Sequence, residues 1–297
     1  ELAEYFDIEL PEKIQDGLSR EMTDNSIALK NYMNARHLLE KLSDKSKLQK
    51  AYELLEETVA LDSNFVEAYA KYAFASMKMG FYDKCEEILD EAMDIADETD
   101  NDRGKLEIYM YFGVLYAVQH KLIKAEKNAE KALTMLQNYN DQSTESRYLY
   151  NLAGVMYYAS KPQKALTYLD RSRILKINLE ENESLAMVYA LYGNIYTILN
   201  DHSKAIDYRE RAAAQCKEMG MEMFACKYMV ALAGSYQRIG DYNMAEDILK
   251  DTDDMDGQTF DEGKMHLIRG RILFEKNECS AALKQLKEAE ETYLKRG

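Results

Sequence analysis

The sequence contains no tryptophan, only 2 prolines and only 13 glycines among its 297 residues. Proline breaks helices and glycine weakens them, so their scarcity removes the residues that most often interrupt an α-helix. Its cysteines are irregularly spaced and form no C-x-x-C pair, which argues against a disulfide framework and predicts reduced thiols. The remainder is rich in Ala, Leu, Glu, Lys and Met, which are good helix formers, so the composition predicts an all-α protein.

Positive charge is also scarce, because 38 Lys and Arg stand against 53 Asp and Glu, for a formal net charge of -15. This balance argues against nucleic acid and anionic membranes as partners, since both are repelled at long range. No apolar run approaches the roughly 20 residues of a membrane span, and no signal peptide is visible. We therefore expect a cytoplasmic protein. Because the chain begins at Glu1 rather than Met, we also expect a piece of a longer protein.

One unit recurs along the chain: a small residue, an aromatic residue three positions later, a polar turn and a second small residue. The clearest copies begin at Gly113, Gly154 and Gly193. In successive units the second small residue is Ala51, Cys85, Ala125, Ala165, Ala205, Ala245 or Ala282, and its spacing is constant from Cys85 to Ala245. Small residues let two helices cross closely, and aromatics on the same helical face fill the space between units. The pattern therefore predicts stacked helix pairs.

Polar turns separate the two helices of each predicted unit. Gly80 is expected to end one helix and Asp83 to cap the next, and Gly240 with Asp241 repeats this design. The acidic stretches 94–102 and 251–257 are expected to be junctions between units. The second of these fails the spacing of an EF-hand, so a solvated loop is favoured over a calcium site.

These residues resemble the tetratricopeptide repeat motif, W-x2-L-G-x2-Y…A-x3-F…P, over roughly residues 28–297. Tyrosine replaces the leading Trp, and the closing Pro is absent from every unit. The resemblance implies an all-α, right-handed superhelical solenoid of about seven helix-turn-helix repeats, mostly of 40-residue period. The predicted organisation is an N-terminal helix or linker over 1–27, then repeats near 28–64, 65–101, 105–141, 145–183, 184–223, 224–256 and 261–297.

A second, narrower resemblance covers about a fifth of the chain, from Ile14 to Ala70. It is similar to the opening of tetratricopeptide regions in bacterial signalling proteins. In those proteins the repeats follow class III adenylate or guanylate cyclase domains, serine/threonine kinase domains or DNA-binding domains. The resemblance implies that such a domain precedes this piece.

No catalytic or metal-binding pattern is found in the sequence. His37, His120, His202 and His266 are scattered and belong to no H-E-x-x-H motif. The phosphate-loop, dinucleotide-binding and nucleophile-elbow motifs are all absent. Carboxylate pairs are plentiful, but on solvated helices most of them are surface charge, and a catalytic pair remains the weaker alternative. We therefore predict no enzyme activity, no metal and no cofactor.

The family resemblance implies a groove lined by the first helix of each unit. Its predicted lining residues are Phe74, Met110, Val114, Asn151, Val155, Tyr158, Asn194, Lys227, Arg238 and Arg271. This set is apolar at first, carries amides in the middle and is basic near the end. An apolar groove with amides suits an extended or helical peptide, while a merely solvated surface is the alternative. The clamp that some tetratricopeptide domains use for chaperone tails is not predicted, because Asn194 and Arg271 are only isolated fragments of it.

Two functional hypotheses follow from this groove. The first is a non-catalytic scaffold or sensor module of a larger signalling or regulatory protein, which binds a protein or peptide segment. The alternative is a regulatory domain that responds to a signal peptide and controls an attached cyclase, kinase or DNA-binding domain. The last helix, from Ala281 to Leu294, is amphipathic with no polar helix after it, so self-association through it is also expected.

Overall fold

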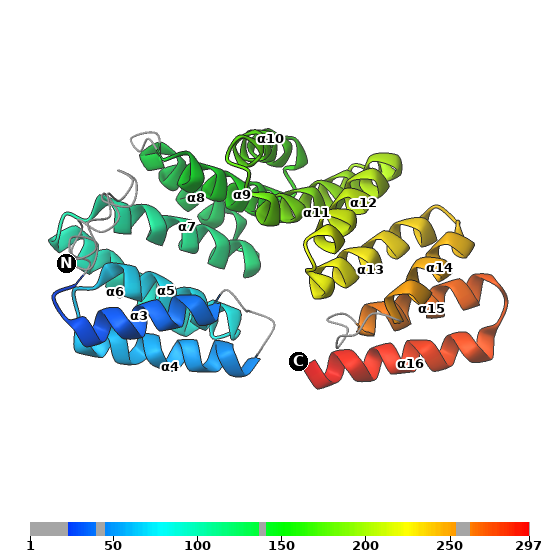
Figure 1. Ribbon diagram of the computed structural model, residues 1–297, viewed down its shortest axis with the longest axis horizontal. Coiled ribbons are helices and arrows are strands. Elements are labelled where there is room, and N and C mark those ends of the chain that lie inside the picture. Colours follow the sequence, from blue (N-terminus) through cyan, green and yellow to red (C-terminus); the bar gives the residue numbers. More distant parts are fainter. Residues whose placement is uncertain (1–22, 40–44, 137–140, 254–261, 297) are drawn as a thin grey trace, which may run out of the picture. The chain divides into compact units, whose positions relative to one another are not determined.

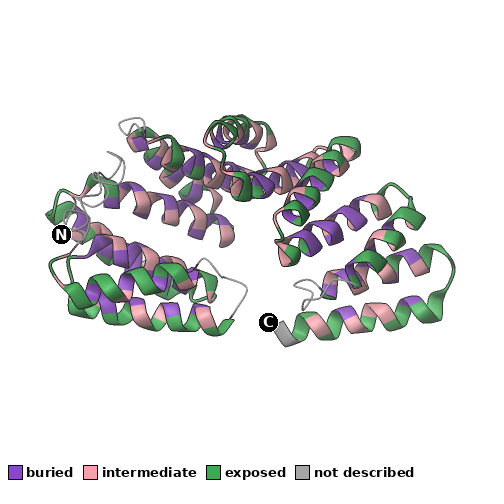
Figure 2. Cartoon of the chain, viewed as in Figure 1, coloured by how far each residue is buried: buried purple, intermediate pink, exposed green. Residues whose placement is uncertain are grey.

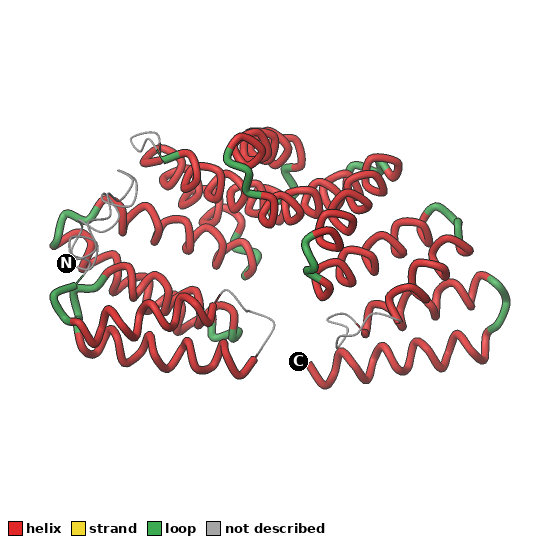
Figure 3. Tube along the Cα trace, viewed as in Figure 1, coloured by secondary structure: helices red, strands yellow, loops and turns green. Residues whose placement is uncertain are grey.

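The computed structural model describes residues 23–39, 45–136, 141–253 and 262–296. All regular secondary structure in these ranges is α-helix (Figure 3). Consecutive helices form antiparallel pairs that are joined by short turns (Figure 1). Most of the predicted N-terminal helix or linker, and residues 254–257 of the second acidic junction, lie outside the described residues.

The chain divides into two compact units. The first comprises residues 1–119 and 127–135. Its helices are α3 (Ser26–Leu39), α4 (Lys45–Leu61), α5 (Val66–Lys78), α6 (Tyr82–Glu98), α7 (Asp102–Val118) and most of α8 (Leu122–Leu136). Helix α5 packs against α3, α4 and α6, and α7 packs against α5 and α6. Each pair therefore buries its apolar face against the next pair, as a helical repeat requires.

The second unit comprises residues 120–126 and 136–297. Its helices are α9 (Gln142–Tyr158), α10 (Pro162–Asn178), α11 (Asn182–Ile198), α12 (His202–Glu218), α13 (Glu222–Arg238), α14 (Tyr242–Asp253), α15 (Glu262–Glu275) and α16 (Cys279–Arg296). Neighbouring helices pack along the series, and the first helices α9 with α11 and α13 with α15 also touch. Figure 2 shows buried positions as stripes along the inner helices, whereas α16 is largely exposed.

One turn geometry joins most of these helices. The left-handed residues that end them are Gly80, Asp100, His120, Ser160, Glu180, Asn200, Gly220, Gly240 and Asn277, so the turn recurs at a regular interval over much of the chain. The next residue donates its backbone N–H to a carbonyl near the end of the preceding helix, as Glu181 does to Lys176 at 2.9 Å. This is the Schellman arrangement, which satisfies the free carbonyls of a helix end. A single short turn thus sets the constant length of the helix pairs.

The capping and junction predictions need correction at two places. Helix α6 begins at Tyr82, so Asp83 lies inside its first turn, and Phe81 occupies the N-cap without a side-chain hydrogen bond. Asp241 does cap α14, because its carboxylate accepts from the N–H of Met244 at 3.1 Å. The predicted acidic junction at 94–102 is mostly helical, since α6 continues to Glu98 and α7 begins at Asp102.

The small residues behave as predicted at Gly193 and not at Gly154. A Cβ built on Gly193 would lie 2.7 Å from Cγ of Arg209 and 3.3 Å from the carbonyl oxygen of Ala205, both in its partner helix. A Cβ on Gly154 would meet nothing within 4 Å. The reason is that the sequence pattern misaligned α9 with the other first helices by one residue. When α9 and α11 are aligned by their first residues, Gln142 and Asn182, the equivalent of Gly193 is Ala153 and not Gly154.

Candidate partner-binding face

The helix register defines which surface positions are equivalent from repeat to repeat. Helices α7, α9, α11 and α13 each have 17 residues, and they begin at the evenly spaced positions Asp102, Gln142, Asn182 and Glu222. Helices α5 and α15 align with them by their C-terminal ends. One set of equivalent residues, called the ladder below, consists of Phe74, Val114, Gly154, Asn194, Gly234 and Arg271.

Every ladder residue is partly or fully exposed, although the residues on both sides of it are buried. The following residues are Ala75, Leu115, Val155, Ile195, Ser235 and Ile272, and all of them are at most 2% exposed. The preceding residues, such as Ala153 and Ala233, are buried as well. The ladder is therefore one repeating open position on the first helices, between two rows of core.

The predicted lining residues divide accordingly. Phe74, Val114, Asn194 and Arg271 are ladder residues, and Tyr158 and Arg238 lie one helical turn beyond Gly154 and Gly234 on the same face. Lys227, two turns before Gly234, is exposed on α13.

Met110 and Val155 are each only 2% exposed, so neither lines an open surface. The same one-residue misalignment shifted the predicted lining residues of α9. As a result, Asn151 and Val155 were named instead of Tyr150 and Gly154.

In the first unit, aromatic and cationic side chains surround the ladder residue Phe74. The ring centroids of Phe74 and Tyr111 are 5.6 Å apart, and the ammonium of Lys78 lies 5.2 Å from the centroid of Phe74. Lys71 donates to the hydroxyl of Tyr111 at 3.0 Å and forms an ion pair with Glu107. Burial alone would lower the pKa of Lys71, but the Glu107 carboxylate raises it overall. These groups are mutually satisfied and hold the aromatic pair in place.

In the second unit, a buried arginine that sequence analysis missed lies behind the ladder. Arg209 of α12 is 9% exposed, and its stem passes over Gly193, the only residue type that leaves room for it there. One terminal nitrogen donates to Oδ1 of Asn194 at 3.1 Å, and the other donates to Oγ of Ser235. Its Nε has no hydrogen-bond partner. Burial, and next the charge of Arg238, lower the pKa of Arg209 to about 10.

The sequence did contain a signal for this residue. Its equivalents in the other second helices are Leu89, Ala129, Leu169, Leu249 and Leu286. An arginine at a position that is otherwise apolar, and that is fully buried at Leu169, breaks the repeat pattern. A search for known motifs does not detect such a break, whereas an alignment of the repeats to one another does.

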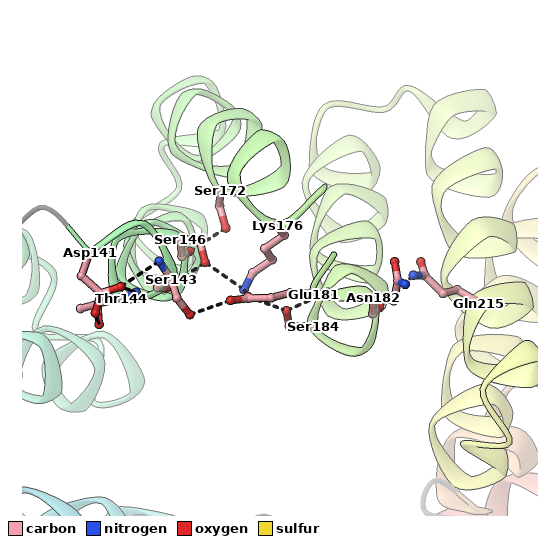
Figure 4. Close-up of polar contacts among 10 residues, drawn as sticks. All are labelled: Asp141, Ser143, Thr144, Ser146, Ser172, Lys176, Glu181, Asn182, Ser184 and Gln215. Atoms are coloured by element: carbon pink, nitrogen blue, oxygen red, sulfur yellow. Dashed lines mark hydrogen bonds and ion pairs between the residues drawn. The ribbon is translucent and has the colours of Figure 1, made fainter. Parts of the chain in front are cut away.

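A second buried cation of the same unit is fully paired (Figure 4). Lys176 of α10 is 4% exposed and donates to Oε2 of Glu181 at 3.0 Å and to Oγ of Ser146 at 3.3 Å. Ser143 donates to the other oxygen of Glu181 at 2.6 Å, and Ser172 donates to the backbone carbonyl of Ser146 at 2.7 Å. This network joins α9, α10 and α11 and gives the buried ammonium a carboxylate counter-ion, so we assign it a structural role.

Other kinds of site find no support in the described part of the chain. No group of three His, Cys, Asp or Glu side chains there could hold a metal ion. No described helix is long and apolar enough to cross a membrane. All four cysteines are free thiols, and burial raises the pKa of Cys85 to about 12 and that of Cys216 to about 11. Neither buried thiol is therefore a ready nucleophile.

Comparison with known proteins identifies the architecture. The chain is similar to a Rap protein complexed with competence and sporulation factor, with 18% identity over 96% of this chain and 80% of that one, and a TM-score of 0.69. It is also similar to a signal transduction ATPase with a tetratricopeptide repeat sensor from Pyrococcus horikoshii, with 17% identity over 98% of this chain and a TM-score of 0.66. The chain spans 50% of the length of that ATPase.

A third similar structure is aspartyl phosphate phosphatase F from Bacillus subtilis, with 12% identity over 93% of this chain and 76% of that one, and a TM-score of 0.63. At these identities the likeness concerns the fold alone. No curated protein matches the sequence. The fold is that of an all-α helical-repeat solenoid.

Residues 64–138 match the family model described as tetratricopeptide repeat. The helix pairs outside that segment have a similar fold to solved tetratricopeptide repeat structures. Proteins of this fold are generally non-catalytic.

Proposed function

We propose that the chain is a non-catalytic module that binds a segment of a partner protein at the ladder residues of its second unit, as a scaffold or sensor part of a larger signalling or regulatory protein. One observation carries the proposal: the ladder position stays open in each repeat from α5 to α15, between rows that are buried. The likeness to tetratricopeptide structures supports the same class of function.

The chemistry of the ladder in the second unit suits an extended peptide. Gly154 and Gly234 present no side chain, and nothing lies within 4 Å of a Cβ built on Gly154. Asn194 lies between them in the series and offers an amide that can donate to a peptide carbonyl while its oxygen accepts from Arg209. The missing side chains let a peptide approach closely, the Asn194 amide can hydrogen-bond its main chain, and neighbouring apolar positions then take its side chains.

Selection of a random peptide library on the immobilised chain tests the proposal. Gly154→Arg and Gly234→Arg each place a long side chain on the ladder of the second unit, and both are expected to abolish capture of the selected peptides. Ile174→Arg, at a residue of α10 that is 52% exposed, is the matched control and should leave capture unchanged. Failure to select any peptide, or capture that tolerates both ladder variants, would overturn the proposal.

The second candidate function is a regulatory domain that responds to a signal peptide and controls an attached cyclase, kinase or DNA-binding domain. It is favoured by the likeness to a Rap protein complexed with a factor and to an ATPase whose repeats are described as a sensor. Hydrogen exchange with a selected peptide separates the two candidates. A scaffold gains protection only in the first helices that carry the ladder, whereas a sensor also changes protection in the second helices. The expected self-association through α16, where Leu294 is 75% exposed, stays a prediction.

A further inference from the structure

Arg209 is a buried cation without a counter-ion. Only two of the five N–H donors of its guanidinium are used, by Asn194 and Ser235, and both partners are neutral. Among the described residues, no carboxylate forms an ion pair with Arg209, and Nε lacks any partner. Burying an ionised group without a paired charge is unfavourable, and most proteins avoid it.

The surroundings make this arrangement less favourable still. Arg238 is close enough to Arg209 to lower its pKa, which is a repulsion between like charges. The same two arginines lower the pKa of Tyr157, although burial raises it overall. Arg238 is exposed and forms no described ion pair with a carboxylate. In a chain of net charge -15, two neighbouring arginines without an acidic partner stand out.

Two of the residues around Arg209 lie on the ladder face. Asn194, which accepts from Arg209, is itself a ladder residue, and Arg238 lies one helical turn beyond Gly234 on the same face. Tyr157 comes from α9 and also remains partly exposed. Arg209 therefore lies directly behind Asn194, at the surface at which a partner segment is proposed to bind.

We propose that Arg209, behind the ladder residue Asn194, binds a carboxylate of the partner segment. The inference rests on the proposed function and adds to it one chemical requirement on the partner. A planar guanidinium with adjacent free donors matches the two oxygens of a carboxylate, which can accept from two of them at once. The ligand supplies the negative charge that the chain itself leaves out, and the source of the carboxylate is either an acidic side chain or a free C-terminus.

Three mixtures of random hexapeptides distinguish these sources. The first has a free C-terminus and no Asp or Glu, the second has an amidated C-terminus and one Asp or Glu, and the third is amidated and contains neither. Each mixture is passed over the immobilised chain, and the retained fraction is measured. Retention of the first or the second mixture at least about tenfold above the third is expected, since bonds to a charged group are the stronger ones.

The substitution Arg209→Leu is expected to remove this preference, because it restores the leucine that other repeats have at this position. Arg211→Leu is the matched control. Arg211 lies on the same helix, is exposed and pairs with Asp207 at 3.1 Å, so its loss changes the net charge equally and leaves the site intact. Thermal unfolding of both variants verifies that they are folded.

The outcomes distinguish failure of the carboxylate site from failure of the proposed function. Equal retention of all three mixtures, with loss on Gly154→Arg, would leave the proposed function standing and overturn the carboxylate site. A preference for acidic peptides that survives Arg209→Leu or disappears in Arg211→Leu would overturn it as well. Retention of none of the mixtures would overturn the proposed function and, with it, the carboxylate site.

Discussion

The two buried cations of the second unit, Lys176 and Arg209, are equally hidden from water and differently surrounded. Both come from second helices, and both occupy positions that are apolar in other repeats. Lys176 is met by the Glu181 carboxylate and by a chain of serines, whereas Arg209 is met only by neutral oxygens and by a second arginine. A buried charge that the chain itself neutralises contributes to the stability of the fold. One that the chain leaves unpaired is better explained by a ligand.

The largest effect is expected from removing the counter-ion of Lys176. Glu181→Gln leaves a 4% exposed ammonium without a carboxylate, and the free energy of unfolding should fall by about 3 kcal/mol. Urea denaturation measures it as a lower midpoint. Glu183→Gln, at an exposed carboxylate of the same helix, is the control and should change the stability by less than about 0.5 kcal/mol. A loss as small for Glu181 as for Glu183 would contradict the structural role of the network.

The same pair predicts the sign of a pH dependence. Burial alone would raise the pKa of Glu181, but hydrogen bonds from Ser143 and Lys176 lower it overall from 4.5. An acid whose pKa is lower in the folded state contributes stability above its unfolded pKa and loses it as pH falls through the folded value. The difference in stability between wild type and Glu181→Gln should therefore be constant near neutrality and shrink below about pH 4.5. A difference that grew on acidification would reverse this assignment.

The next effect concerns the space that Arg209 occupies. Gly193→Ala puts a methyl group 2.7 Å from Cγ of Arg209, so the variant should lose about 1–2 kcal/mol despite the better helix propensity of alanine. Gly154→Ala, with nothing within 4 Å, should instead gain up to about 1 kcal/mol. In the double variant Gly193→Ala/Arg209→Leu the loss should disappear, because Ala153 and Leu169 already form this combination one repeat earlier. Additive effects in this cycle would mean that the two residues are not in contact.

A smaller change of opposite sign is expected from Arg209→Leu alone. Replacing an uncompensated buried charge by an apolar side chain should raise the free energy of unfolding by about 1 kcal/mol or more. Thermal unfolding measures it as a higher midpoint. Lys176→Leu is the contrasting variant and should destabilise, because it leaves the partly buried Glu181 without its cation. If both variants destabilised alike, Arg209 would be as structural as Lys176, and the comparison between them would fail.

The repeat period explains why so much of the fold followed from sequence. Short turns of one geometry keep the helices α7, α9, α11 and α13 at 17 residues each, so small and aromatic residues recur at fixed intervals and reveal the pairs. The misplacement of Asn151 and Val155 shows the limit of this signal. In α9 the adjacent Ala153 and Gly154 are both small, and only the register of the helix decides which of them faces the partner helix.

The face itself was less accessible to sequence reasoning. Asn194 was named because it lies at a position that the family resemblance implies, and Arg238 because it adds positive charge near the basic end of the predicted groove. Arg209 was missed because its meaning depends on what surrounds it: the space above Gly193, the neutral Ser235 and the absence of a described carboxylate. Sequence shows that a position deviates from its repeats, whereas packing shows whether the deviation is satisfied.

The smallest effect is expected at the turns that precede α11 and α12. Glu180 and Asn200 both adopt left-handed backbone, with φ of 56° and 57°. Asparagine tolerates this region better than glutamate does, so Glu180→Gly should gain about 0.5–1 kcal/mol and Asn200→Gly distinctly less. Chemical denaturation of both variants measures the difference. A loss of stability in Glu180→Gly would instead mean that the glutamate side chain holds Glu181 in position for Lys176, and the network would then extend into the turn.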